Sequence, residues 1–170
     1  MLTLGIDPAL SATGLCLVRD GEPLEWLTLR TRAKDEVDRR IAGLAKQVAV
    51  QVAGHRPEVV AIEEPYVATW ERGSTGMAKA ADAMDLARLV TALVVEATRA
   101  GALVVMIPPP EGFRALTGSP KGDKAGHVRM ANARRGRLAR LDESEHHLAD
   151  AYGVALAGEA RARFGAEEGE

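Results

Sequence analysis

Acidic and imidazole side chains stand at the ends of two predicted strands and on one predicted helix. Asp7 and Glu63 each end a short apolar run, and His147 and Asp150 lie three residues apart in a segment with a helical pattern. A strand carries its last side chain to the edge of its sheet, so two strand ends and one helix face can meet at a point. Carboxylates gathered without basic partners repel one another and resist burial. A divalent cation would relieve this repulsion, so we expect these four side chains to be metal ligands.

Two of these assignments have a neighbour that competes with them. Glu64 competes with Glu63, because consecutive strand residues point to opposite faces and the sequence does not say which face contains the site. His146 competes with His147, since spacings of three and of four residues both bring helical side chains close to Asp150. Both alternatives stay open at this point.

Positive charge is concentrated in one segment of the chain. The net charge is only −2, but residues 114–140 contain eight basic residues and one acidic residue, which gives this segment +7 and leaves −9 for the rest. Such segregation predicts a phosphate-binding face and favours a nucleic-acid partner. The basic residues are Arg114, Lys121, Lys124, Arg129, Arg134, Arg135, Arg137 and Arg140.

Apolar periodicity predicts an α/β domain. Three strands joined by short connections form an antiparallel meander, with a hairpin turn at Asp20-Gly21. Apolar residues then recur at helical spacing in five segments, and two short apolar runs between them predict buried strands. The predicted strands are 2–6, 14–19, 23–31, 59–63 and 103–107, and the predicted helices are 35–54, 77–100, 111–117, 124–138 and 145–163. This order predicts a mixed five-stranded sheet with helices on both faces.

Length and composition fit a single domain. We place it at residues 1–163 of the 170, with 46% apolar residues to form its core and a frayed acidic tail at 164–170. The sequence has no apolar run of membrane-spanning length and no basic-then-apolar leader, so we expect a cytoplasmic protein. The single cysteine, Cys16, falls in an apolar strand, where we expect a buried free thiol.

Four segments together carry a family resemblance. They read LGIDPALSATG at 4–14, VAIE at 60–63, TGSPKGDK at 117–124 and HLADA at 147–151. In this order, across about residues 2–157, they resemble the motifs of the RuvC-type Holliday junction resolvases, which belong to the ribonuclease-H-like superfamily. Two residues depart from the usual pattern: Ala9 replaces a glycine, and His147 replaces the aspartate of many members, although a histidine variant also occurs.

The resemblance implies a fold and a reaction. The fold is ribonuclease-H-like, with the first and fourth strands adjacent so that Asp7 and Glu63 come together. The reaction is paired phosphodiester hydrolysis in four-way (Holliday) DNA junctions by a homodimer. Two Mg²⁺ ions would bind at Asp7, Glu63, His147 and Asp150, with Asp7 bridging them and Mn²⁺ as an alternative ion in vitro. A branch-migration helicase is a possible further partner.

The resemblance also implies residues that contact DNA. Lys124, with Lys121 or Arg114, would stabilise charge on the scissile phosphate. Tyr66 and Trp70 stand in the loop after the second motif, where an aromatic side chain would stack on bases near the junction centre. Further phosphate contacts are expected from Arg129, Arg134, Arg135 and Arg137.

Three other functions fit parts of the sequence. A related ribonuclease-H-like nuclease could act on RNA or on other branched DNA, because a metal site does not report its substrate. An actin-like nucleotide-binding protein also begins with a strand, an aspartate, a glycine and a threonine, but we find no second phosphate loop. An inactive junction-binding protein is disfavoured, because all four site positions carry groups that can bind metal.

Overall fold

The computed structural model describes residues 1–65, 76–121 and 123–167. Within them, five strands form one mixed sheet in the order β3-β2-β1-β4-β5. The first three strands pair antiparallel, whereas β1, β4 and β5 run parallel to one another. The strands are β1 (Leu2–Asp7), β2 (Ala12–Arg19), β3 (Glu22–Arg30), β4 (Val59–Glu63) and β5 (Leu103–Ile107). The meander and the adjacency of the first and fourth strands are confirmed.

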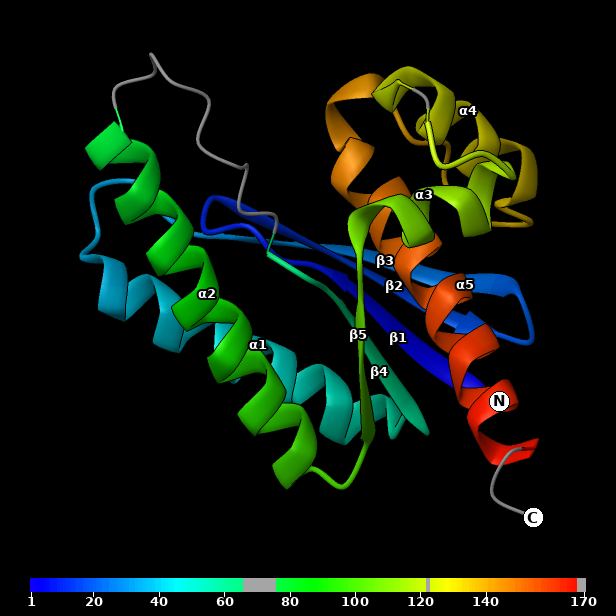
Figure 1. The fold of residues 1–170 in the computed structure, drawn as a ribbon, viewed down its shortest axis with the longest axis horizontal. Helices are drawn as coiled ribbons and strands as arrows, with labels where there is room; N and C mark the ends of the chain where they lie inside the picture. The colour runs from blue at the N-terminus through cyan, green and yellow to red at the C-terminus, as the bar shows by residue number, and fades with distance from the viewer. Residues whose placement is uncertain (66–75, 122, 168–170) are drawn as a thin grey trace.

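Helices cover both faces of this sheet, as predicted. Figure 1 shows α1 and α2 side by side against one face, and α5 against the other face with α3 and α4 next to it. The helices are α1 (Val37–His55), α2 (Gly76–Arg99), α3 (Pro109–Thr117), α4 (Lys124–Arg134) and α5 (His146–Glu167), with a 3-10 helix, η1 (Glu143–Glu145), before α5. Among these helices, none combines the length and the uniform apolarity that a bilayer crossing requires.

Alternation along β1 divides the core between the two helical layers. Leu4 and Ile6 pack with the buried residues of α1 and α2. Gly5, between them, faces α5, where its α-carbon lies against Ala151. Because side chains alternate along a strand, Asp7 at the end of β1 also points to the α5 side. Cys16 is buried in the core beneath α5, as expected.

Two glycines let the first turns of α5 lie directly on the sheet. A β-carbon added to Gly5 would stand 2.1 Å from the carbonyl oxygen of Ala151, and one added to Gly14 would stand 2.2 Å from that of His147. Both contacts are with backbone atoms, which cannot rotate away as a flexible side chain can. Because Gly5 and Gly14 have no side chains, α5 can lie close to β1 and β2, and this distance sets the position of Asp150.

Element ends differ from the predictions by a few residues. The predicted helix 124–138 ends at Arg134, because the side chain of Asn132 donates to the carbonyl of Leu141 (3.0 Å) and accepts from its N–H (2.8 Å), which folds the following segment back. The last helix runs to Glu167 instead of 163, so part of the expected tail is helical. The turn at Asp20-Gly21 is present, with φ of 51° and 84°.

Candidate active site

Asp7 and Glu63 end neighbouring parallel strands. Ile6 pairs with Ile62, so the two acidic residues follow at the same edge of the sheet. On β4, Val60 and Ile62 face the α1 and α2 layer while Ala61 packs beneath α5, so alternation directs Glu63 to the α5 side. Glu63 therefore shares a face with Asp7, and this relationship favours Glu63 over Glu64.

The carboxylates of this edge perturb one another. Burial raises the pKa of Asp7 well above its ordinary value, and the charges of Glu63 and Asp150 raise it further. Burial also raises the pKa of Glu63 to about 7, with a second contribution from Asp150. The three acidic residues come from β1, β4 and α5, and their charges act on one another across this edge of the sheet.

Lys124 is the positively charged residue that acts on Asp7 and Glu63. It is the first residue of α4, and its ammonium group lowers the pKa of both Asp7 and Glu63, although by less than burial raises them. Its Nζ lies 2.8 Å from Nε2 of His146. The start of α4 thus reaches across to the first turn of α5, and His146 is directed toward Lys124.

His147 is directed toward a different element. It is buried, and its Nε2 lies 2.7 Å from Oγ1 of Thr28 on β3. Burial lowers the pKa of its imidazole, and the nearby side chains of His146 and Arg30 lower it further. The ring is therefore neutral at pH 7, which is the form that binds metals. Whether it contacts an ion stays a prediction.

Asp150 has a partner that the sequence analysis missed. Nδ1 of His127 on α4 is hydrogen-bonded to Oδ1 of Asp150, and the His127 ring stacks on Phe113 of α3 with centroids 3.9 Å apart and an interplanar angle of 11°. One signal could have pointed to it. His127 follows Lys124 by three residues in a predicted helix, so the two share a helix face.

The types of donor in this cluster fit a hard divalent cation. Asp7, Glu63 and Asp150 supply carboxylate oxygens, the ligands that Mg²⁺ prefers, and their mutual repulsion is the electrostatic condition that a cation relieves. Within the described ranges, however, no three histidine, cysteine or acidic side chains stand close enough together to coordinate one ion. The donor types therefore fit a divalent cation, but the side chains are not in coordinating positions in this structure.

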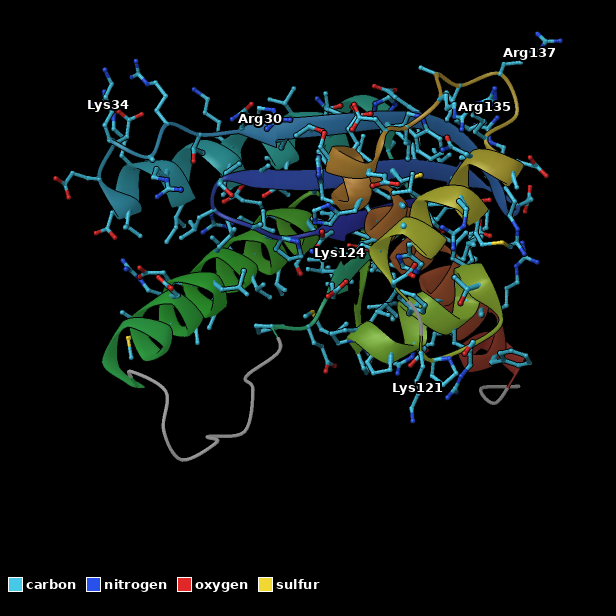
Figure 2. The ribbon with its side chains drawn as sticks, turned by 90° about the horizontal axis from the view of Figure 1, so that it is seen from above. Arg30, Lys34, Lys121, Lys124, Arg135 and Arg137 are labelled. Carbon is cyan, nitrogen blue, oxygen red and sulfur yellow. The ribbon has the colours of Figure 1, made fainter. Side chains whose placement is uncertain are left out.

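The basic residues of 114–140 are mostly exposed. Arg114, Lys121, Arg129, Arg134, Arg137 and Arg140 are solvent-accessible, whereas Arg135 is partly buried. Figure 2 shows Lys124 near the middle of the view, with Lys121 at one border and Arg135 and Arg137 at the opposite border. Arg30 and Lys34, which were not predicted, continue that second border. Tyr66 and Trp70 lie outside the described residues.

The loop after Asp7 accommodates its alanine. The hydroxyl of Thr13 donates to the carbonyl of Ala9 (2.8 Å) and accepts from its N–H (3.3 Å). Outside glycine, the described residues with positive φ are Asp20 and Arg56, so Ala9 does not adopt a conformation that needs glycine. The departure from the family pattern leaves the turn intact.

The fold, together with the carboxylates of Asp7, Glu63 and Asp150, defines a nuclease of the ribonuclease-H-like class. A family model described as crossover junction endodeoxyribonuclease RuvC matches residues 3–158. The chain belongs to this family. The RuvC protein of Salinispora arenicola is 33% identical over 162 residues, which cover 92% of this chain and 85% of that protein.

Solved structures of relatives superpose over nearly the whole chain. Thermus thermophilus RuvC is 26% identical and covers 97% of each chain with a TM-score of 0.75. The same protein in complex with a Holliday junction substrate gives a TM-score of 0.78, covering 97% of this chain and 96% of that one. The ribonuclease-H-like fold that the resemblance implied is confirmed.

Proposed function

We infer that this chain is an endodeoxyribonuclease that hydrolyses phosphodiester bonds in four-way DNA junctions. The observation that supports this most strongly is the convergence of Asp7, Glu63 and Asp150 on one edge of the sheet in a member of the RuvC family. A relative binds a Holliday junction as its substrate. The shared fold and family favour the same substrate class for this chain over RNA or nucleotides.

We propose that divalent cations bind at Asp7, Glu63, Asp150 and His147. Oxygen donors favour Mg²⁺, and the imidazole makes Mn²⁺ an effective substitute. When bound, two such ions would supply the Lewis acidity that stabilises charge on the attacking and departing oxygens of the phosphodiester. The protein contributes three carboxylates, and burial together with the charge of Asp150 raises the pKa values of Asp7 and Glu63, so a cation that offsets these charges is favoured once they are ionised.

The contact between His147 and Thr28 supports a ligand role for His147. Metal-binding histidines usually donate their other ring N–H to a fixed acceptor, which sets the tautomer and the ring orientation. With Nε2 protonated and bonded to Oγ1 of Thr28, Nδ1 carries the lone pair that coordination requires. The lowered pKa of the imidazole keeps this nitrogen unprotonated at neutral pH.

Lys124 is proposed to neutralise charge on the scissile phosphate. It lies beside the acidic cluster at the N-terminus of α4, where a helix also presents unpaired backbone N–H groups to an anion. Exposed basic side chains on both sides of Lys124 would bind the flanking phosphates of the DNA arms (Figure 2). Among them, Arg114 lies on α3 and Lys121 in the loop that follows it.

The junction substrate also suggests an assembly. A four-way junction presents two symmetry-related strands, and a two-fold homodimer would place one acidic edge on each. We propose that the chain acts as such a dimer, and that a branch-migration helicase supplies its substrate in the cell. Stacking of Tyr66 and Trp70 on junction bases is proposed from the family resemblance alone.

Cleavage of matched substrates tests this function. The protein is incubated in Mg²⁺ with labelled four-way junction, linear duplex of the same sequence, an RNA–DNA hybrid and ATP. We expect paired nicks in opposite strands of the junction, and no product from duplex or ATP. Faster cleavage of the hybrid would support the alternative nuclease, and binding of the junction without cleavage in Mg²⁺ or Mn²⁺ would contradict the enzymatic assignment.

A further inference from the structure

His127 is a buried polar residue with a specific contact to the acidic site. The residue is 2% exposed, and its Nδ1 is hydrogen-bonded to Oδ1 of Asp150. Its ring stacks almost parallel on Phe113, so an aromatic neighbour from α3 fixes the plane of the imidazole. Buried histidines on apolar helix faces usually contribute only to packing. This one forms a hydrogen bond with a carboxylate of the candidate active site.

The surroundings of the ring select one tautomer. A carboxylate accepts hydrogen bonds, so Nδ1 is the donor to Asp150. Nε2 is buried and has no hydrogen-bond partner among the described residues. A proton on Nε2 would leave a buried donor unpaired, at a cost of about 1 to 3 kcal/mol. The Nδ1–H tautomer, with the lone pair on Nε2, is therefore the favoured form.

The contact is one half of a two-point connection between α4 and α5. Lys124 and His127 lie one turn apart on α4, and their partners His146 and Asp150 lie one turn apart on α5. Lys124 contacts His146 at 2.8 Å, and His127 contacts Asp150. The first turns of the two helices are thus joined face to face, which places Lys124 where it lowers the pKa of Asp7 and Glu63.

We propose that His127 is a positioning residue for metal binding. It fixes one oxygen of Asp150 and leaves the second available to a cation, and it aligns α4 so that Lys124 stays beside the carboxylates. This inference rests on the proposed function. Partners that orient a metal-binding side chain typically change metal affinity by about 10- to 100-fold when they are removed.

The test compares variants of His127 with a packing control from the same helix. His127→Val removes the donor, whereas His127→Asn retains an amide N–H at the position of Nδ1. Val128→Ala removes buried apolar volume from the next residue of α4, where Val128 is 4% exposed, without touching Asp150. Each protein is titrated with Mn²⁺ in a calorimeter without DNA, and its melting temperature and junction affinity are measured in EDTA.

We expect His127→Val to weaken Mn²⁺ binding by about 10- to 100-fold. His127→Asn should stay within about threefold of the native chain, and Val128→Ala should lower the melting temperature without changing Mn²⁺ affinity. Junction affinity in EDTA should be the same in all four proteins. Cleavage by His127→Val should recover when the Mn²⁺ concentration is raised, because the defect is in binding the ion.

Three outcomes would overturn the proposal. Unchanged Mn²⁺ affinity in His127→Val would mean that the hydrogen bond does not position Asp150. Equal losses in His127→Val and His127→Asn, or the same loss in Val128→Ala, would assign the effect to packing. Absence of both Mn²⁺ binding and junction cleavage in the native chain would contradict the proposed function itself, and this inference with it.

Discussion

Oγ1 of Thr28 lies 2.7 Å from Nε2 of His147 and joins strand β3 to the first turn of α5. β3 is an edge strand of the sheet and contributes no acidic residue to the cluster of Asp7, Glu63 and Asp150. Its hydroxyl nevertheless forms a hydrogen bond with the His147 ring. A threonine on the strand farthest from β5 is therefore expected to influence metal binding.

Thr28→Val tests this relationship, because valine keeps the shape of the side chain and removes the hydroxyl. We expect Mn²⁺ affinity, measured by calorimetry, to fall by about tenfold as the ring of His147 loses its fixed orientation. The control is His146→Ala, which removes the partner of Lys124 and should change Mn²⁺ affinity by less than about twofold. A larger loss in His146→Ala than in Thr28→Val or His147→Ala would identify His146 as the ligand.

The raised pKa of Glu63 predicts how stability depends on pH in EDTA. The unfolded chain releases this proton near pH 4.5, whereas the folded chain keeps it until about pH 7. Between these values the folded state binds more protons, so stability falls as pH rises, and the penalty is complete above pH 7. Its size is on the order of 3 kcal/mol. Asp7 contributes in the same direction.

Unfolding by urea at pH 5 and at pH 8 measures this penalty. We expect Glu63→Gln to lose less stability than the native chain between the two pH values, because glutamine does not ionise. Glu64→Gln is the matched control and should follow the native profile. Parallel profiles for the native chain and Glu63→Gln would show that the carboxylate is not destabilised by its surroundings.

The close contact between Gly5 and α5 predicts a large effect of one methyl group. Gly5→Ala places a β-carbon against the carbonyl of Ala151, so α5 must move away from β1. We expect a loss of about 1 to 3 kcal/mol in the free energy of unfolding, and slower cleavage as Asp150 moves from Asp7. Gly43→Ala is the control, since that position on α1 has open space and alanine favours a helix by about 0.5 to 1 kcal/mol. Equal stability of the two variants would contradict the packing of α5.

The basic residues at the end of α4 and just after it predict the salt dependence of DNA binding. If Arg134, Arg135 and Arg137 contact phosphates, each replacement by glutamine should lower the slope of log K against log salt by about 0.9, on junction and on duplex alike. Arg99→Gln is the control, because Arg99 lies at the end of α2 in an ion pair with Glu96. An unchanged slope in the triple variant, measured by titration at several salt concentrations, would place the DNA elsewhere.

Local patterns were sufficient to predict most of the fold. The strands at 59–63 and 103–107 appear with the predicted bounds, because short apolar runs between helices are unambiguous. The end of α4 was missed, since the Asn132 contacts that fold the chain back come from Leu141, nine residues away. The choice between Glu63 and Glu64 also required the sheet, because only pairing with β1 defines the face.

The residues that orient the site side chains could not be predicted, because their contacts join elements that are distant in the sequence. His127 and Asp150 are 23 residues apart, and Thr28 and His147 are 119 residues apart. Neither partner has a motif of its own. The acidic residues were predictable because strand ends meet at a sheet edge, whereas the residues that orient them depend on how α4, α5 and β3 pack.

The most direct test of the central claim is cleavage of a four-way junction by Asp7→Asn in Mg²⁺. Asparagine keeps the size of the side chain but removes the charge from the end of β1. We expect cleavage to be abolished while junction binding in EDTA survives, with Glu64→Gln as the control that retains both. Glu63→Gln should behave as Asp7→Asn does. Substantial cleavage by Asp7→Asn, or loss of cleavage in Glu64→Gln with activity kept in Glu63→Gln, would contradict the acidic edge of β1 and β4 as the catalytic site.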